Sequence, residues 1–330
     1  MKKTLRGLIA GTAALALSAG SAFAEKIVIG HFGNPTPMQI ARAEGLFEKA
    51  TGWDIEWRKF ASGAEIIAAM ASGDVKISEL GSSPTTIAMS QGVDMQMFML
   101  AIVIGKAESL VARDGSGVSN VADLKGKRVA VPIGSTAHFS LMGALQHEKV
   151  PVSEVKIMGM PPDQIAAAWE QGAIDAAFVW EPAQSRILKT GKRILGADTT
   201  AAWGFPTFDG WVVNKEFAAS HAKEMAAFAK VADEANAAYL ANPAAWTPTS
   251  PQVLTIAKMT GASPEEIPDS MKGYTFVPLA EQLSDKWLGS APATLKATAE
   301  FLKAAGRIEK VADSYAPFVN TSIAKAAVGK

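Results

Sequence analysis

Two short hydroxyl-rich turns are the features of this sequence whose residue types best suit chemistry. Each follows an apolar stretch and opens a predicted helix: Gly81-Ser82-Ser83-Pro84 and Gly134-Ser135-Thr136. Backbone N–H groups at a helix N-terminus, like side-chain hydroxyls, donate hydrogen bonds to an anion. We therefore expect the two turns to bind one small anionic ligand between them. The candidate residues are Ser82, Ser83, Ser135 and Thr136.

Helix capping is the alternative interpretation of both turns. Serine before Pro84 is the usual pattern of an N-cap with proline in the first helical turn, and either Ser135 or Thr136 can cap the helix that follows. His138 lies in the first turn of that helix. It can reach the same anion, and a position on the helix surface explains it equally well.

A group of aromatic and acidic residues follows the last predicted strand of the alternating region. Trp180 and Glu181 leave this strand, and Asp209 lies in the Trp-rich segment 203–211. A tryptophan at the end of a strand can cover a ligand's short carbon chain, and a carboxylate can pair with a ligand's cation. We expect Trp180 and Asp209 to do this, with Glu181 as the second carboxylate. Core packing of the tryptophans and N-capping by Glu181 are the alternatives.

Motifs of catalysis and of metal binding do not occur in the sequence. It has neither a Gly-x-Ser-x-Gly elbow nor a Walker-type loop, and its four histidines have no metal-ligand spacing. It has no cysteine, which excludes disulfides, thiol catalysis and a lipid-modified cysteine. We therefore expect a protein that is not an enzyme and holds neither metal nor cofactor.

Alternating strands and helices should position these residues. The pattern predicts a mostly parallel sheet with helices on both faces, and apolar residues 95–104 form a buried strand pair or bend. Strands are expected at 26–30, 53–60, 75–80, 128–133, 155–160 and 174–179. Helices are expected at 37–49, 64–72, 120–124, 136–149, 162–171 and 182–190, the first weakened at Gly45. Ala-rich helices at 221–240, 250–261 and 292–305 should brace one lobe.

The chain is long enough for two lobes. Short crossings are expected at Ser109–Arg113 and Gly210–Asn214, so that residues 25–110 and 213–330 form the first lobe and 111–212 form the second. Two α/β lobes joined by short segments make a hinge and a cleft that closes around a ligand. Both serine turns lie at the carboxyl ends of strands, where ligands bind in such sheets.

The first 24 residues are typical of an export signal. Lys2, Lys3 and Arg6 precede an apolar run at 8–17, and Ala22-Phe23-Ala24 suits cleavage before Glu25. We expect a periplasmic protein that diffuses freely as a monomer. The formal net charge of the whole chain is zero, without a basic stripe, so nucleic acid is not an expected partner.

Several segments resemble the periplasmic taurine-binding proteins of taurine ABC importers. They are Trp57–Phe60, Ser62–Ala64, Ala71–Val75, Leu80–Pro84, Gly126–Pro132 and Trp203–Asp209. The Ser-Gly-Asp and Leu-Gly-Ser-Ser-Pro pieces are shared with the wider family of nitrate-, sulfonate- and thiamine-precursor-binding proteins. Trp-Gly-x-Pro-Thr-x-Asp and Ser135–His138 are the pieces that point to taurine. The chain departs from the pattern at His31–Pro35 and at Glu181.

The resemblance implies a type II periplasmic binding protein, in which each lobe is a mixed sheet flanked by helices. It implies hinge closure on taurine, delivery to an ABC permease, and no catalysis. Neutral donors of both turns and His138 would bind the sulfonate, and Trp180 would lie along the two-carbon body. Asp209, with Glu181 second, would accept the ammonium.

Other functions remain open at this point. The pocket can instead take another alkanesulfonate or an aminophosphonate, although a second phosphonate charge would call for an arginine or lysine that is not obvious in the cleft. An exported enzyme of the same fold would need a nucleophile or cofactor lysine at a strand end, and none is evident. An extracytoplasmic sensor partner would differ only in what the closed lobes bind.

Overall fold

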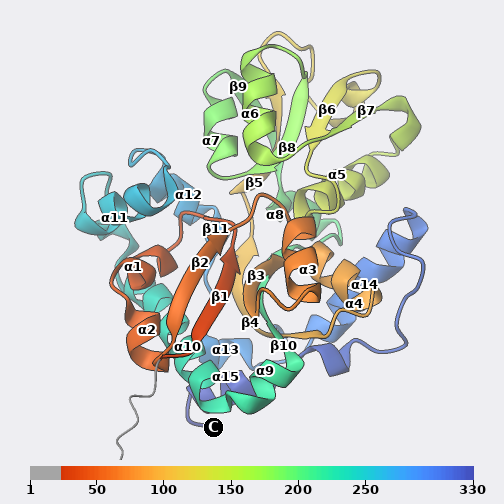
Figure 1. The fold of residues 1–330 in the computed structure, drawn as a ribbon. Coiled ribbons are helices and arrows are strands. Elements are labelled where there is room, and N and C mark those ends of the chain that lie inside the picture. Colours follow the sequence, from red (N-terminus) through yellow and green to blue (C-terminus); the bar gives the residue numbers. More distant parts are fainter. Residues whose placement is uncertain (1–23) are drawn as a thin grey trace, which may run out of the picture.

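Two lobes, each built on one β-sheet with helices packed against it, make up the molecule (Figure 1). The computed structural model describes residues 24–330, so the predicted export signal lies outside the described residues except for Ala24. No helix of the described part of the chain is long and apolar enough to cross a bilayer.

The first lobe holds a six-stranded sheet in the order β11-β4-β10-β3-β1-β2. Its strands are β1 (Lys26–His31), β2 (Asp54–Lys59), β3 (Ile77–Gly81), β4 (Met95–Ile104), β10 (Phe208–Asn214) and β11 (Tyr274–Thr275). Its helices are α1 (Met38–Ala43), α2 (Leu46–Thr51), α3 (Gly63–Ala71), α4 (Ser82–Ser90), α9 (Lys215–Ser220), α10 (Ala222–Ala241), α11 (Pro251–Thr260), α12 (Ile267–Lys272), α13 (Leu279–Gln282), α14 (Ala291–Ala304) and α15 (Thr321–Ala327). Figure 1 shows α3, α4 and α14 gathered on one side of this sheet and α1, α2 and α10 on the other.

The second lobe holds a five-stranded sheet in the order β7-β6-β8-β5-β9. Its strands are β5 (Glu108–Arg113), β6 (Arg128–Val131), β7 (Lys156–Gly159), β8 (Ala176–Trp180) and β9 (Gly191–Gly196). Its helices are α5 (Thr136–His147), α6 (Pro162–Glu170), α7 (Ala183–Leu188) and α8 (Ala197–Ala202), with a short 3-10 turn at Val121–Leu124.

The chain passes between the sheets at residues 105–107 and 203–207, a few residues before the segments expected from the sequence. Ser109–Arg113 belongs to β5 of the second sheet, and Gly210–Asn214 belongs to β10 of the first. The apolar runs expected to bridge the lobes are therefore buried strands. Both links are short. The first is packed tightly, because a Cβ on Gly105 would come within 2.7 Å of the Gly273 carbonyl oxygen.

Both sheets are mixed, which confirms what the resemblance implies; the mostly parallel sheet expected from the strand–helix alternation alone is wrong. β1 pairs in parallel with β2 and β3, and β6 with β7 and β8. β10 is antiparallel to β3 and β4, and β5 is antiparallel to β8 and β9. The antiparallel strands β5 and β10 are those that the chain enters directly from the other lobe. They run away from the cleft, whereas the strands that pair with them run toward it.

The helix predicted for residues 37–49 is divided into α1 and α2 at Gly45. This residue has a φ of +63°, a left-handed conformation that glycine adopts at low cost and that interrupts a helix. The apolar stretch 95–104 is one continuous strand rather than a strand pair, because it pairs with β10 from Met95 to Val103. The three predicted Ala-rich helices correspond to α10, α11 and α14.

Aromatic residues form the centre of the first lobe's core. The ring of Phe228 on α10 lies 4.7 Å from Phe47, 5.0 Å from Trp211 and 6.1 Å from Phe98, measured between ring centroids. These four side chains are essentially fully buried. They pack α2 and α10 tightly against one face of the sheet, and this packing holds in place the strands that lead to the cleft.

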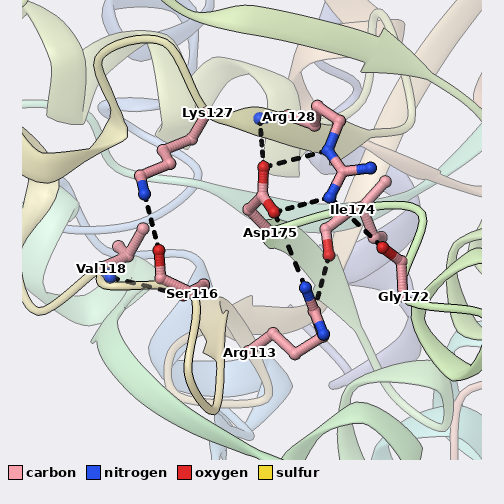
Figure 2. A network of polar contacts seen from close by, with 8 residues as sticks. All are labelled: Arg113, Ser116, Val118, Lys127, Arg128, Gly172, Ile174 and Asp175. Atoms are coloured by element: carbon pink, nitrogen blue, oxygen red, sulfur yellow. Dashed lines mark hydrogen bonds and ion pairs between the residues drawn. The ribbon is translucent and has the colours of Figure 1, made fainter.

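A network of polar contacts joins the ends of β5, β6 and β8 that lie away from the pocket (Figure 2). Asp175 accepts hydrogen bonds from the backbone N–H of Arg128 at 2.9 Å and from its guanidinium at 2.7 and 3.1 Å. The guanidinium of Arg113 lies 3.8 Å away. These hydrogen bonds, chiefly with Arg128, lower the pKa of Asp175 to about 2. Charges at these strand ends are therefore paired within the chain.

Candidate ligand-binding site

A pocket between the two lobes encloses about 410 Å³ of empty space, open solvent at its mouth included. Both sheets contribute to it through the carboxyl ends of β1, β3, β6 and β8 and the first residues of β5 and β10. Ligands of mixed α/β sheets bind at this edge. The lining residues are Phe32, Asn34, Gly63, Gly81, Pro84, Ile104, Glu108, Ser135, Thr136, Trp180, Asp209 and Tyr274.

The two serine turns meet at this pocket, as the sequence predicts. A Cβ on Gly81 would come within 2.8 Å of the Thr136 methyl group, so only glycine permits this approach of the lobes. Gly81 is also the N-cap of α4 and has no side-chain acceptor for the first N–H groups of that helix. The N-terminus of α4 therefore offers free donors to an anion at the pocket.

The hydroxyls of these turns make hydrogen bonds within the chain, and the capping interpretation is confirmed for Ser135. Ser135 donates to the Pro132 carbonyl at 2.6 Å and accepts from the His138 backbone N–H at 3.1 Å, so it caps α5 while it lines the pocket. Ser82 and Ser83 are buried behind the lining. Ser82 accepts from the Phe208 backbone N–H at 3.4 Å, and Ser83 Oγ has no partner in residues 24–330.

His138 is buried beside the pocket but does not line it. Its Nδ1 accepts a hydrogen bond from the Gly134 backbone N–H at 3.3 Å, and its Nε2 has no partner within the described chain. Burial, together with the charge of Arg307, lowers the pKa of His138 to about 4. A neutral imidazole at this position does not supply a positive charge to a ligand.

Three buried carboxylates lie at the pocket or next to it: Glu108 and Asp209 line it, and Glu79 lies beside them. Asn34 Nδ2 donates to Glu79 Oε1 at 3.1 Å and to Asp209 Oδ2 at 3.3 Å. Thr136 Oγ1 donates to Glu108 Oε2 at 2.7 Å, and so joins the second lobe's turn to the first residue of β5. The other oxygen of Glu108 is buried without a hydrogen-bond partner among residues 24–330. An uncompensated buried acceptor of this kind is costly unless a ligand completes it.

Burial raises the pKa of all three carboxyls in the ligand-free protein. The pKa of Glu79 is raised to about 7 and that of Glu108 to about 8. The pKa of Asp209 is raised well above its usual range by burial and by the charges of Glu79 and Glu108. Arg42 partly offsets the burial of Glu79 but lies outside the lining, where it donates to Gln39 and packs over the Trp57 ring.

Aromatic side chains from both lobes form one wall. The rings of Phe32 and Trp180 meet edge to face with their centroids 6.2 Å apart, one from the loop after β1 and the other from the end of β8. Tyr274 adds a buried hydroxyl that has no partner within the described residues. The wall offers apolar contact to a ligand's carbon chain, and the hydroxyl offers one more polar contact.

Glu181 lies outside this pocket and lines a second hollow, which is polar, together with Lys106, Lys189 and Lys272. Both of its oxygens accept hydrogen bonds within the chain, from Gln184 Nε2 at 2.7 Å and from the Ser185 backbone N–H at 3.0 Å. The capping interpretation of Glu181 fits this geometry, since the carboxylate satisfies the first turn of α7.

Sequence reasoning missed Glu108, Glu79, Asn34 and Tyr274. Glu108 and Glu79 did carry a signal, because each is a lone carboxylate in an otherwise apolar or small-residue strand, Glu-Ser-Leu-Val-Ala and Ile-Ser-Glu-Leu-Gly. A charge within a buried strand needs a partner or a ligand. Asn34 and Tyr274 lie in loops or strand ends that come together only in the folded chain.

The pocket can therefore hold both charges of a small zwitterion. No lysine or arginine is among the residues that line it, and no group of acidic or histidine side chains in residues 24–330 is arranged to hold a metal ion. Acceptors and helix N-termini, rather than ionic side chains of both signs, define its two ends. Asp209 Oδ1 lies 3.2 Å from the Cβ position of Gly81, so these two ends are close together.

Known proteins with similar sequences are binding proteins. The family model described as "NMT1/THI5 like" matches residues 33–245. The taurine-binding periplasmic protein of Escherichia coli K12 is 39% identical over 309 residues, which cover 94% of this chain and 96% of that protein.

Solved structures share the two-lobed fold. The alkanesulfonate-binding protein SsuA from Xanthomonas axonopodis pv. citri, bound to MOPS, superposes with a TM-score of 0.76 at 21% identity over 90% of this chain and 99% of its own. The desulfurization enzyme DSZB superposes with a TM-score of 0.66 at 14% identity over 92% of this chain and 99% of its own. The chain thus has the type II two-lobed fold, which both binding proteins and an enzyme share.

Proposed function

This chain belongs to the NMT1/THI5-like family, and on that premise we propose that it is the periplasmic substrate-binding protein of an ABC importer that captures taurine between its lobes. Its 39% identity to a taurine-binding periplasmic protein over nearly the whole length of both chains supports the proposal. The departures at His31–Pro35 and Glu181 do not oppose it, because Asn34 in the first segment contributes a pocket residue and Glu181 lies elsewhere.

One observation carries the choice of a zwitterion. Buried carboxylates at Glu108 and Asp209 face a pocket that has no lysine or arginine in its lining. A ligand with an ammonium group completes these acceptors, and a ligand without one leaves them desolvated and unpaired. Asp209 and Glu108 are the ammonium partners in this proposal, and Trp180 contacts the carbon chain.

The sulfonate binds the free donors of α4 and the turn at Ser135–Thr136. A sulfonate needs no proton transfer and no opposite charge, so backbone N–H groups at a helix N-terminus suffice. Asp209 lies beside Gly81, at the start of α4. The opposite charges of the ligand must therefore be separated by a short linker, as they are by the two carbons of taurine.

The carboxylates also make the pocket selective for taurine over related ligands. A simple alkanesulfonate would leave Asp209 and Glu108 without a counter-charge, which opposes its binding. An aminophosphonate satisfies the carboxylates but can carry a second negative charge, for which the lining offers no lysine or arginine. Binding of either ligand more tightly than taurine would contradict the proposed specificity.

An enzyme of this fold is the alternative from another class. The site offers it little, because Thr136 donates its hydroxyl to Glu108 and Ser135 donates to a backbone carbonyl. The chain contains no cysteine. We infer that the protein binds without turnover: the lobes close about the links at 105–107 and 203–207, and the closed form delivers the ligand to a permease. We also propose that the protein is exported, is cleaved after Ala24 and acts as a monomer.

Calorimetry tests the proposal. The purified chain, freed of co-purified ligand by unfolding and refolding, is titrated in parallel with taurine, ethanesulfonate and 2-aminoethylphosphonate. We expect tight, saturable binding of taurine, much weaker binding of the other two, and recovery of unchanged taurine after incubation. Preference for ethanesulfonate would contradict the carboxylate–ammonium pairing. Absence of binding by all three would contradict the taurine assignment itself.

A further inference from the structure

Three phenylalanine rings form a cluster between the lobes, outside the ligand pocket. Phe139 belongs to α5 of the second lobe, Phe205 to the second link, and Phe301 to α14 of the first lobe. The centroid of the Phe139 ring lies 4.8 Å from that of Phe301 and 5.9 Å from that of Phe205, and Phe205 and Phe301 are 5.5 Å apart. Each pair meets edge to face, which is a favourable arrangement for aromatic rings.

Phe205 is held by the second lobe and presents its ring to the first. Its backbone N–H donates to the Thr200 carbonyl at 2.9 Å, and its ring fills the space beside Gly143, where a Cβ would come within 2.5 Å. Phe139 therefore belongs to the second lobe, Phe205 is hydrogen-bonded to that lobe from the link, and Phe301 belongs to the first lobe. A movement of the lobes about the links changes the contact between the Phe139 and Phe301 rings.

The cluster is connected to the ligand pocket through two helices. Phe139 lies less than one turn after Thr136, which lines the pocket at the start of α5. Helix α14 packs against α4, whose N-terminus lies at the other serine turn (Figure 1). One helix of the first lobe thus contacts both helices that begin at the pocket, and Phe301 is its contact with α5.

We propose that Phe139, Phe205 and Phe301 form an interlobe latch that assembles when the cleft closes and that slows release of the ligand without touching it. The reason is physical: opening exposes apolar ring surface that closure buries, so the latch stabilises only the closed state. Phe301 is then a positioning residue for the turn at Ser135–Thr136. The effect on ligand release rests on the proposed function, whereas assembly of the latch on closure does not.

The test compares Phe301→Ala with Phe318→Ala. Phe318 is a matched control, because it is also partly buried in the first lobe but packs against Tyr315 and Lys215, away from the second lobe. We expect Phe301→Ala to weaken taurine binding about tenfold through faster dissociation, with association nearly unchanged. Phe301→Leu should recover part of the loss, and Phe318→Ala should bind like the unmodified protein.

A distance measurement separates failure of the latch from failure of the taurine assignment. Because the chain has no cysteine, a spin-label pair at Ser153→Cys and Lys223→Cys, exposed positions of the second and first lobes, reports the separation of the lobes. We expect Phe301→Ala to deplete the short-distance population in ligand-free protein, and Phe318→Ala to leave it unchanged. Identical distributions for Phe301→Ala and the unmodified protein, with and without taurine, would overturn the latch. If the distributions of Phe301→Ala and the unmodified protein differ without ligand, but neither responds to taurine, the latch stands and the taurine assignment is wrong.

Discussion

Strand β5 carries a charged residue at each end, and the two ends have opposite environments. At the far end, Arg113 lies near Asp175, whose carboxylate is paired with Arg128 and has a pKa lowered to about 2 (Figure 2). At the cleft end, Glu108 has one oxygen without a partner among residues 24–330, and burial raises its pKa to about 8. At the far end, the chain itself pairs the carboxylate with a positive charge. At the cleft end, we expect a ligand's cation to pair with the Glu108 carboxylate.

This difference distinguishes structural charges from functional ones. Glu108 is almost fully buried and Asp175 only partly, so burial contributes to the difference. A second difference is whether the chain itself supplies the opposite charge, as Arg128 does for Asp175. Substitutions that remove a carboxylate's charge should therefore have opposite consequences in the two regions.

The largest effect is expected for Asp209→Asn. The amide keeps the size of the side chain but removes the charge that pairs with the ammonium, at a cost of about 3 kcal/mol, or roughly a hundredfold in taurine affinity. Ethanesulfonate, which has no ammonium, should bind no worse than before. Calorimetric titrations of both ligands measure the ratio. An equal loss for the two would contradict the pairing.

The next prediction sets Glu108→Gln against Asp175→Asn in ligand-free protein at pH 8. Asp175→Asn breaks a paired network and should lower the free energy of unfolding by about 1–2 kcal/mol. Glu108→Gln removes a charge that burial disfavours and should raise it by about 1–3 kcal/mol. Denaturant unfolding measures both changes. Destabilisation by both variants would show that Glu108 is paired within the chain after all.

The pH dependence of stability should also differ between the cleft carboxyls and Asp175. Glu79 and Glu108 have raised pKa values in the folded protein, about 7 and about 8, so their contribution is fully present below their ordinary pKa and is lost as the pH rises through these values. The lowered pKa of Asp175 gives stability that is present above its ordinary pKa and is lost as the pH falls through about 2.

Ligand-free protein should therefore become less stable from pH 5 to pH 8, by on the order of 2 kcal/mol, and saturating taurine should reduce this decline. Thermal unfolding across this range, with and without taurine, makes the comparison. A melting temperature that is level over the range without ligand would contradict the raised pKa values of the cleft carboxyls.

The smallest effect is expected for Trp180→Ala. The indole meets Phe32 in the wall of the pocket and carries no charge, so its loss should weaken taurine and ethanesulfonate alike, by about five- to tenfold. Parallel titrations of the two ligands measure it. A loss confined to taurine would assign the tryptophan to the ammonium, through its ring face, rather than to the carbon chain.

Local patterns allowed part of this site to be predicted from the sequence. A strand, a glycine with hydroxyl residues and a helix follow one another at 77–90 and at 128–147, and this order alone places both turns at strand ends. Gly45 marked a weak point where the structure divides the helix, for the same local reason.

The remainder depends on relationships that no local pattern contains. Glu108 is a pocket residue because the link between the lobes ends just before it, and its partner Thr136 comes from another strand–helix turn. His138 and Glu181 stand in suggestive sequence positions, but His138 is buried outside the lining, bonded to Gly134, and Glu181 is bonded to Gln184 of α7. Asn34 joins two carboxylates that are 130 residues apart.

We infer that the cleft carboxyls, partly protonated in the ligand-free protein, become ionised when a ligand's ammonium binds. Calorimetry of taurine binding at pH 7, repeated in buffers of different ionisation enthalpy, counts the protons exchanged. With the pKa of Glu108 at about 8 and that of Glu79 at about 7, we predict net release of about one proton per taurine bound. The Glu108→Gln variant has no titrating carboxyl at position 108, so it should release fewer protons. Heats that are independent of the buffer would contradict the account, because the carboxyls would then not change state on binding.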